Sequence, residues 1–487
     1  MPSIRGQKHE RETITPTITG MHAIHTQMYQ EADVNGFLCK IFRRKEDLLV
    51  APGETWDGYP HSPRYPCGKS LDGHALIIGG REVGKTALIS QLAAEAIQRG
   101  DALIALDMDG DLIAALLPQI PRGRFSDVAW LQMTDPAALP GFNALDVSHG
   151  EPTNLIVENV VRTAPLLWGS YWAPGVEDAL AISVRTLVAA NRVLVERHEP
   201  QFTLLDIHQL FDLPKFCKKL LDEYVRDEAV VRWWSGLLDR RSWLNRDDYS
   251  ALITPLERFS GSTLELNLGQ SESSLKLQER LWPGRITLID LSAPTWDTKL
   301  RAWFRALLAD RIYQTILTRE PALSHSPAHS MVVAIDGHLE LARVDEPGLL
   351  ADLHERGARC VLTNLAAPAV IAGANKLFVF GTSRSFAEGL APEFGREVAP
   401  DDLEDLASCE FYARTIGKNH QVHVSRYSTC KPLKTNDPGK HAIQRGIVPS
   451  GVREAAATEV RRRFWNRWYG RLVTELVRDA EQARSGD

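Results

Sequence analysis

Hydrophobic residues follow two periodicities along this chain, and together they predict the order of strands and helices. Short apolar runs typical of buried strands cover 74–79 and 102–106, and 85–99 between them has helical spacing that ends at Gly100. A strand, a helix and a strand in this order imply a parallel sheet with right-handed crossovers. Further strand-like runs follow much later, at 285–290, 331–335, 360–363 and 376–380. We therefore expect one α/β sheet whose strands come from two separated parts of the chain.

The segment between these two groups of strands has a different character. Long amphipathic stretches such as 176–197 and 215–238 contain few β-branched runs, which indicates helices. The first residues are polar and rich in glycine and proline, with one alternating stretch at 36–42. We expect five parts: an N-terminal arm or small β-subdomain (1–70), the first part of the α/β domain (71–150), an all-helical insertion (151–283), the second part of the α/β domain (284–430), and a C-terminal linker with a basic, aromatic helix (431–487).

Composition narrows the class of protein. Of the 487 residues, 44% are hydrophobic and 24% are charged, and the formal net charge is −6, as in globular proteins. No run of eighteen apolar residues occurs, the first residues lack the apolar core of a signal peptide, and the six cysteines form no C-x-x-C pair. We expect a cytoplasmic protein with no membrane span of its own, no disulfide framework and no zinc site.

The strongest chemical signal follows the first strand. Residues 79–86 read Gly-Gly-Arg-Glu-Val-Gly-Lys-Thr, which fits the phosphate-loop pattern G-x-x-x-x-G-K-[ST]. Glycines let the backbone wrap around phosphates, and the N–H groups that begin the next helix face the anion. Lys85 would reach the outer phosphates of ATP, and Thr86 would hold Mg²⁺; the alternative is an ordinary glycine turn. The residues expected to bind the nucleotide are Gly79, Gly80, Arg81, Glu82, Val83, Gly84, Lys85, Thr86 and Ala87.

A second motif fits the first. The apolar strand at 331–335 delivers Asp336 to the carboxyl edge of the sheet, where open α/β sheets bind their ligands. We interpret Asp336 as the carboxylate of a Walker-B element, which supports Mg²⁺ directly or through another ligand. The alternative is a turn residue at the end of a strand, next to Gly337.

In their order, these features resemble the HerA/FtsK clade of hexameric DNA-pumping ATPases, especially the soluble, conjugation-associated branch related to type IV coupling proteins. The resemblance covers about residues 70–430. It implies a RecA-like P-loop NTPase domain, a hexameric ring that uses ATP and Mg²⁺, DNA as a partner, and a possible protein partner of a secretion, relaxosome or nuclease type. Besides the phosphate loop it rests on Asp-Met-Asp-Gly-Asp-Leu at 107–112, Gly-Phe-Asn-Ala-Leu at 141–145, Trp-Ala-Pro at 172–174, Trp-Trp at 233–234 and Ile-Asp-Leu-Ser at 289–292.

Two departures from the family bear on its chemistry. The family has Asp-Glu at the Walker-B position, whereas this chain has Gly337 after Asp336, so the expected general base is missing. His338 or Glu340 would substitute only if the turn presents them to the γ-phosphate, and a Glu at position 337 should raise turnover if the missing base limits it. Where the family often has a Gln that senses the γ-phosphate, this chain has Thr363-Asn364, and Asn364 can still orient a water.

Two further sets of basic residues are candidates on the basis of the resemblance. A ring ATPase needs an arginine from the neighbouring subunit to offset the charge on the phosphates. Gly381 stands where the family has this arginine, so the candidates are Arg384, three residues on, and Arg356, which precedes Gly357; the alternative for each is a surface residue in solvent. In the C-terminal segment, a helix would align Arg463, Arg467 and Arg471 in one stripe. That stripe would grip DNA phosphates, or it would face solvent while the aromatic residues pack on the body.

The sequence therefore predicts an ATP-dependent DNA translocase. The main alternative is a nucleotide-binding scaffold that switches a partner between states, with Gly337 marking the loss of efficient hydrolysis. A small-molecule P-loop kinase is a weaker alternative, because it does not account for the long helical insertion or for the order of the family-like segments.

Overall fold

The computed structural model describes residues 71–133, 140–238, 246–259, 262–319, 330–337, 348–364, 367–417, 419 and 421–429. These residues belong to one compact unit. The predicted N-terminal arm and the C-terminal segment with its arginine stripe lie outside the described residues, and so do His338 and Glu340.

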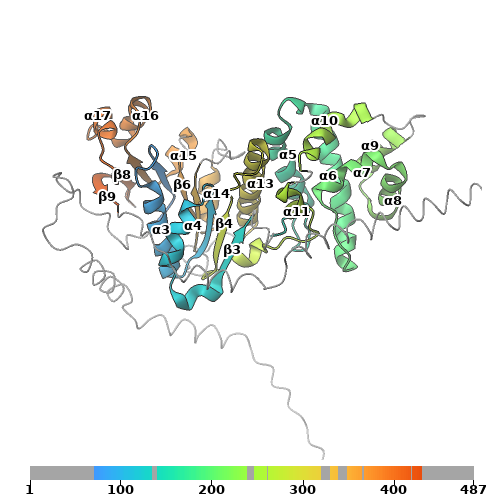
Figure 1. Ribbon diagram of the computed structural model, residues 1–487, viewed down its shortest axis with the longest axis horizontal. Coiled ribbons are helices and arrows are strands. Elements are labelled where there is room, and N and C mark those ends of the chain that lie inside the picture. Colours follow the sequence, from blue (N-terminus) through green and yellow to red (C-terminus); the bar gives the residue numbers. More distant parts are fainter. Residues whose placement is uncertain are drawn as a thin grey trace, which may run out of the picture. The chain divides into compact units, whose positions relative to one another are not determined.

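A nine-stranded sheet lies at the centre of the described residues (Figure 1), in the order β3-β4-β2-β5-β6-β1-β7-β8-β9. All pairs from β3 to β7 are parallel, whereas β8 and β9 add to the edge as antiparallel strands. This arrangement confirms the predicted α/β class with a parallel-rich central sheet. The strands are β1 (Ala75–Ile78), β2 (Ala102–Asp107), β3 (Val128–Gln132), β4 (Ile286–Asp290), β5 (Met331–Asp336), β6 (Ala358–Thr363), β7 (Lys376–Phe380), β8 (Glu410–Ile416) and β9 (Val422–Ser428).

The six strands predicted from apolar runs are present, and they form a continuous block from β4 to β7. No apolar run predicted β3, β8 and β9, which lie at or next to the edges of the sheet. Strands near an edge carry polar side chains on their open side and lack the unbroken apolar runs of central strands. In β9, for example, Val422 and His423 are exposed.

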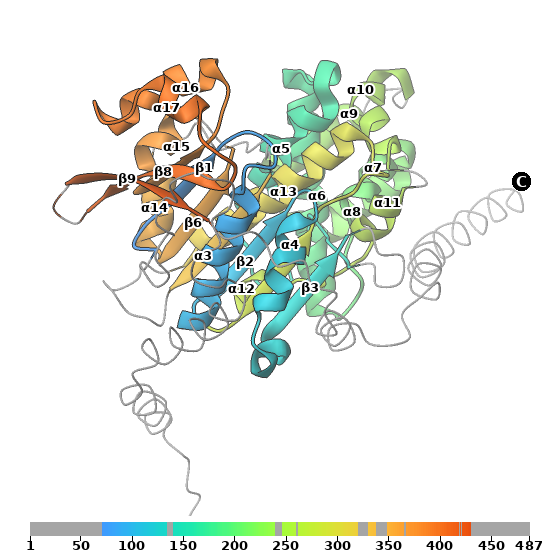
Figure 2. The same ribbon diagram turned by 60° about the vertical axis from the view of Figure 1, so that its left-hand side comes forward.

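Side chains alternate along the central strands and build two hydrophobic layers, one on each face of the sheet. In β2, Leu103 and Ala105 belong to one layer, whereas Ile104 and Leu106 belong to the other. The first layer is completed by α3 (Lys85–Arg99) and α4 (Asp111–Leu116), which Figure 2 shows side by side on one face. The second layer contains α5 (Thr153–Trp168), α13 (Thr298–Leu317), α14 (Leu349–Glu355), α15 (Pro368–Gly373) and α16 (Arg384–Leu390).

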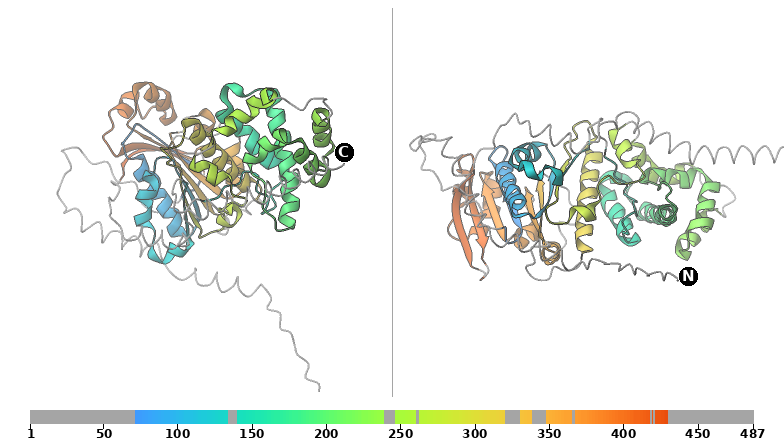
Figure 3. Two further views of the ribbon diagram at one scale, coloured as in Figure 1. Left: turned by 45° about the vertical axis from the view of Figure 1, so that its right-hand side comes forward. Right: turned by 90° about the horizontal axis from the view of Figure 1, so that it is seen from below.

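The described elements between β3 and β4 are all helical, as the sequence predicts. They share a hydrophobic core with α13 and one face of the sheet, and α13 lies between the sheet and most of them (Figure 3). Because of this shared core, the boundaries of an insertion domain at 151 and 283 stay a prediction. None of the described helices has both the length and the hydropathy needed to cross a lipid bilayer. Besides α5, these helices are α6 (Pro174–Glu196), α7 (Ile207–Asp212), α8 (Pro214–Tyr224), α9 (Glu228–Leu238), α10 (Arg246–Glu257), α11 (Thr263–Leu268) and α12 (Leu277–Arg280).

One carboxyl group in this helical part makes its stability depend on pH. Asp206 is buried just before α7 and accepts hydrogen bonds from Thr203 N at 2.7 Å and from Gln209 Nε2 at 2.9 Å. Burial raises the pKa of Asp206 to about 7, although these hydrogen bonds oppose the shift. The folded state thus binds this proton more tightly than the unfolded state does.

We expect the free energy of unfolding to decrease as the pH rises from about 4 to about 7. Near pH 4 the Asp206 carboxyl group loses its proton in the unfolded state, and above about pH 7 it is charged in the folded state as well. The loss attributable to Asp206 should reach up to roughly 4 kcal/mol. Denaturant unfolding between pH 4 and 8 tests this, with Asp206→Asn expected to flatten the curve and Asp222→Asn, at an exposed position of α8, expected to leave it unchanged. Parallel curves for Asp206→Asn and the unsubstituted chain would contradict the assignment.

Candidate functional site

The turn between β1 and α3 has a backbone that few residues other than glycine adopt. Gly84 precedes α3 with φ of +108°, and Glu82 also lies in the left-handed region, with φ of +58°. Space is restricted at the start of the turn, because a Cβ added to Gly79 would lie 2.7 Å from Cβ of Phe380. The first N–H groups of α3 have no partner within the helix and face this turn. The backbone can therefore surround an anion at the N-terminus of α3.

Segments from the far end of the chain hold this turn in place. Gly80 N donates to the carbonyl oxygen of Gly381, directly after β7, at 2.8 Å. Cys409 N donates to the carbonyl oxygen of Val83 at 2.8 Å, and Thr429 N donates to that of Cys409 at 2.8 Å. The ends of β7, β8 and β9 thus support the turn from outside.

The side chains of Lys85, Thr86, Asp336 and Thr363 meet at the carboxyl edge of the sheet. Thr363 Oγ1 donates to Asp336 Oδ1 at 2.9 Å, and the Thr86 side chain also interacts with the Asp336 carboxyl group. The Lys85 ammonium donates to the carbonyl oxygen of Gly79 at 3.1 Å and interacts electrostatically with Asp336. The structure therefore brings together three of the residues predicted from sequence. It adds Thr363, which directly precedes the predicted sensor Asn364.

At both Lys85 and Asp336, burial and the neighbouring charge shift the pKa in opposite directions. Burial lowers the pKa of Lys85, and the negative charge of Asp336 counteracts that effect. Burial raises the pKa of Asp336, whereas the hydrogen bonds from Thr86 and Thr363 and the charge of Lys85 lower it. A hydroxyl and a carboxylate in direct contact suit Mg²⁺, which commonly takes one or two protein oxygens and completes its shell with phosphate oxygens and water. Thr86 and Asp336 fit such an ion by their chemistry and their contact.

Space for a side chain is restricted at Gly337. This glycine has φ of +108°, and an added Cβ would lie 2.6 Å from Cβ of Met108 and 3.4 Å from Oδ2 of Asp109. Gly337 N donates to Thr363 Oγ1 at 2.8 Å, which fixes the backbone at this point. A side chain at position 337 would therefore strain this backbone and displace Met108. Whether a Glu there raises turnover stays a prediction.

The remaining predicted loop residues and the predicted sensor differ in how exposed they are. Arg81 and Glu82 are exposed, whereas Ala87 is buried within α3. Asn364 follows β6 with φ of +57°, and its backbone N–H donates to the carbonyl oxygen of Ile77 at 2.8 Å. Asn364 thus has a structural role through its backbone, and its side chain is exposed.

The two candidate arginines lie at opposite ends of the parallel strands. Arg356 precedes β6, and its guanidinium donates to the carbonyl oxygens of Leu317 at 2.8 Å and of Asp352 at 3.0 Å. Arg384 follows the carboxyl end of β7, and the phosphate loop follows the carboxyl end of the neighbouring strand β1. Arg384 is exposed. Its ion-pair partners are Glu388, Asp401 and Glu404.

A row of carboxylates continues along the same edge, beyond Asp336. Asp107, at the end of β2, accepts hydrogen bonds from Gly110 N and Ile113 N, both at 2.7 Å, and burial raises its pKa to about 6. Arg305 from α13 donates to the carbonyl oxygens of Met108 and Leu291. This arginine thereby joins the ends of β2 and β4, and the sequence offered no signal for it.

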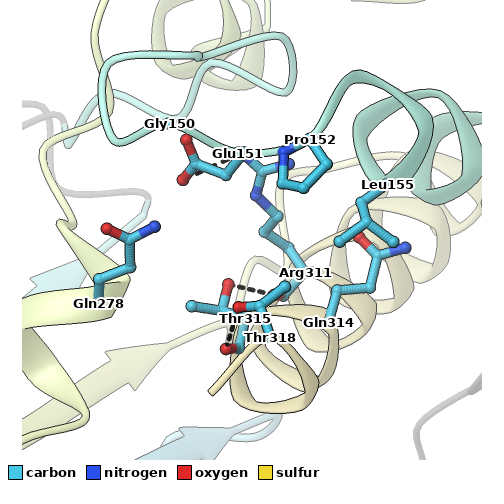
Figure 4. Close-up of a pocket in the computed structure, with 9 residues that line it drawn as sticks. All are labelled: Gly150, Glu151, Pro152, Leu155, Gln278, Arg311, Gln314, Thr315 and Thr318. Atoms are coloured by element: carbon cyan, nitrogen blue, oxygen red, sulfur yellow. Dashed lines mark hydrogen bonds and ion pairs between the residues drawn. The ribbon is translucent and has the colours of Figure 1, made fainter. Parts of the chain in front are cut away.

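A pocket of about 240 Å³ lies elsewhere, between the start of α5 and the second half of α13 (Figure 4). Arg311 forms an ion pair with Glu151 at 3.5 Å and donates to the carbonyl oxygen of Asp146 at 3.2 Å, so it ties the segment before α5 to α13. The pocket shares no residue with the phosphate-loop site. Its lining residues are Gly150, Glu151, Pro152, Leu155, Gln278, Arg311, Gln314, Thr315 and Thr318.

No family model and no curated protein matches the chain. Among solved structures, the unbound form of the bacterial conjugative coupling protein TrwBdeltaN70 aligns with a TM-score of 0.51 at 15% identity, over 79% of this chain and 92% of that chain. The plasmid coupling protein TrwB in complex with ADP and Mg²⁺ aligns with a TM-score of 0.51 at 15% identity, over 78% and 92%. TrwB with the non-hydrolysable ATP analogue ADPNP gives 0.50 at 15%, over 80% and 98%.

At this level of identity the likeness shows the fold. The chain shares the α/β fold of the conjugative coupling protein TrwB, which confirms the fold that the sequence resemblance implies. The wider HerA/FtsK relationship stays a prediction, and so do the roles of the individual site residues.

We expect Gly337→Ala to lower the free energy of unfolding by roughly 1–3 kcal/mol, because the added methyl group meets Met108 and the backbone is left-handed. Gly337→Glu should cost at least as much and should reduce nucleotide turnover. Gly175→Ala is the matched control, since a Cβ there meets nothing within 4 Å. Thermal or denaturant unfolding of the three variants measures the difference, and a stable, more active Gly337→Glu variant would contradict the steric argument.

Proposed function

We propose that the chain is an ATPase that binds ATP and Mg²⁺ at the phosphate loop and translocates DNA as part of an oligomeric ring. The observation that carries the proposal is the contact of Lys85, Thr86 and Asp336 beside the N-terminus of α3. Support comes from the shared fold with TrwB, whose solved complexes contain ADP with Mg²⁺ or an ATP analogue.

Each residue has a separate task in this proposal. The N–H groups of the turn and Lys85 bind the phosphates, where Lys85 exchanges its bonds to loop carbonyls for bonds to phosphate oxygens. Thr86 and Asp336 hold Mg²⁺, which neutralises charge on the β- and γ-phosphates when it is bound. Thr363 keeps the Asp336 carboxylate oriented through its hydroxyl. Asn364, as the sensor, would turn its exposed side chain toward the γ-phosphate.

The proposal that the chain translocates DNA is based on the fold that it shares with the coupling protein TrwB. TrwB is a conjugative coupling protein, and a related role for this chain would make DNA its substrate and a secretion, relaxosome or nuclease component its protein partner. A hexameric ring would let Arg356 or Arg384 act on the site of the next subunit. The cytoplasmic location expected from the sequence stays a prediction. The second candidate function, a scaffold that binds nucleotide without efficient turnover, is favoured by the lack of space for a Glu at position 337.

The deciding experiment is steady-state ATP hydrolysis with and without duplex and single-stranded DNA. We expect Lys85→Ala to lower kcat/KM by at least about 100-fold, because the variant loses the cation that the loop directs at the phosphates. Lys218→Ala, at an exposed position of α8, is the control and should behave like the unsubstituted chain. Turnover stimulated by DNA supports the motor. Tight ATP binding with no turnover above the Lys85→Ala level supports the scaffold and overturns the ATPase.

Mixing experiments identify the arginine that acts between subunits. Arg384→Ala and Lys85→Ala chains should each be inactive alone, by about 100-fold or more. Mixed rings should regain about one quarter of the active sites, where an intact Lys85 meets an intact Arg384 of the neighbour. Arg356→Ala mixed with Lys85→Ala is the parallel test of the other candidate. If neither mixture regains activity although both arginine variants are inactive, the arginine does not act in trans.

A further inference from the structure

Any ATPase with this loop needs a group that orients and deprotonates the attacking water. The residue after Asp336 cannot supply it, because Gly337 has no room for a side chain. The atoms that fill the space where that side chain would begin are Cβ and Cγ of Met108, at 2.6 and 2.9 Å, and Oδ2 of Asp109, at 3.4 Å. A carboxylate therefore does lie beside the position after Asp336, but it comes from the end of the neighbouring strand.

The position of Asp109 follows from the pairing of β2 with β5. Asp107 lies opposite Asp336 in the parallel register, and Met108 N donates to the carbonyl oxygen of Asp336 at 3.0 Å. The backbone N–H of Asp109 donates to Asp107 Oδ1 at 3.2 Å, which shapes the turn that follows. As a result, the Asp109 side chain leaves the sheet at the edge where Asp336 contacts the phosphate loop.

Other carboxylates at this edge are already engaged. Both oxygens of Asp107 accept backbone N–H groups, Asp336 is bonded by Thr86 and Thr363, and Asp290 accepts Ser292 N at 2.9 Å. By contrast, no hydrogen bond or ion pair from the described residues holds the Asp109 carboxylate, which is exposed. It interacts electrostatically with Asp336 and with Arg305. Of Asp107, Asp109, Asp290 and Asp336, Asp109 is thus the one whose two carboxylate oxygens both lack a hydrogen-bond partner among the described residues.

We propose that Asp109 is the general base of this ATPase and takes the place of the acidic residue missing at position 337. This inference rests on the proposed function. In the reaction the water oxygen bonds to the γ-phosphorus while its proton passes to the Asp109 carboxylate. The bond from that phosphorus to the bridging oxygen breaks, and ADP leaves with the electron pair. Asp109 then returns the proton to bulk water.

The test compares Asp109→Asn, Asp109→Glu and the matched control Asp111→Asn, which removes an exposed charge two residues away in the same segment. The unsubstituted chain and Lys85→Ala are measured in parallel. We expect Asp109→Asn to lower kcat by about 100-fold or more. Its dissociation constant for a non-hydrolysable ATP analogue, measured by calorimetry, should change by less than about threefold, since Lys85 and the loop make the phosphate contacts. Asp109→Glu should keep a substantial part of the activity, and Asp111→Asn should match the unsubstituted chain.

The outcomes separate this inference from the proposed function. If the unsubstituted chain hydrolyses ATP and Asp109→Asn is equally active, the base lies elsewhere, and the same assay with His338→Ala and Glu340→Gln locates it. If Asp109→Asn loses analogue binding or unfolds at a lower temperature, Asp109 has a structural role and the inference is wrong. If the unsubstituted chain shows no turnover above Lys85→Ala, the proposed ATPase is wrong, and the base is wrong with it.

Discussion

The register of the parallel strands is the constraint on which the site depends. Asp107 pairs with Asp336 across β2 and β5, Ile335 pairs with Leu362 across β5 and β6, and Ile77 pairs with Thr363 across β6 and β1. A shift of one residue in any of these pairings would turn each side chain of that strand to the opposite face of the sheet. The alignment therefore brings a carboxylate, a hydroxyl and the start of the phosphate loop to one edge. Apolar layers on both faces hold the register, because a slip would bury polar side chains in them.

The phosphate loop depends on contacts that are distant in the sequence. Val83 and Gly80 are bonded to Cys409 and Gly381, so the loop reaches its shape only when the C-terminal strands are in place. Gly84 also lies against this support, since a Cβ there would come within 3.2 Å of the Cα of Cys409. Movements of β8 and β9 would therefore change the loop itself. The antiparallel strands β8 and β9 thus connect the open edge of the sheet to the phosphate loop through backbone hydrogen bonds.

The central part of the fold was predictable because its strands are buried on both faces and appear in the sequence as unbroken apolar runs. The phosphate loop and Asp336 were predictable because their chemistry requires fixed residue types at fixed spacing. Thr363, Asp109 and Arg305 were not, since their roles follow from which strands become neighbours. Gly337 shows the limit most clearly: its sequence position suggests a lost side chain, whereas the structure shows a backbone packed against Met108. Only tertiary contacts distinguish these two interpretations.

The contacts of the two candidate arginines differ in how readily each could be exchanged for a phosphate of a neighbouring subunit. Arg356 lies at the amino end of β6 and donates hydrogen bonds to backbone carbonyl oxygens there. Moving it would leave those carbonyls without this donor. Arg384 lies on the edge with the phosphate loop, and its three carboxylate partners are exposed. Exposed ion pairs are weak because water replaces them at little cost. A γ-phosphate presented by a neighbouring subunit could therefore draw Arg384 away from its present partners, whereas the same exchange at Arg356 would disrupt the fold around α13 and α14.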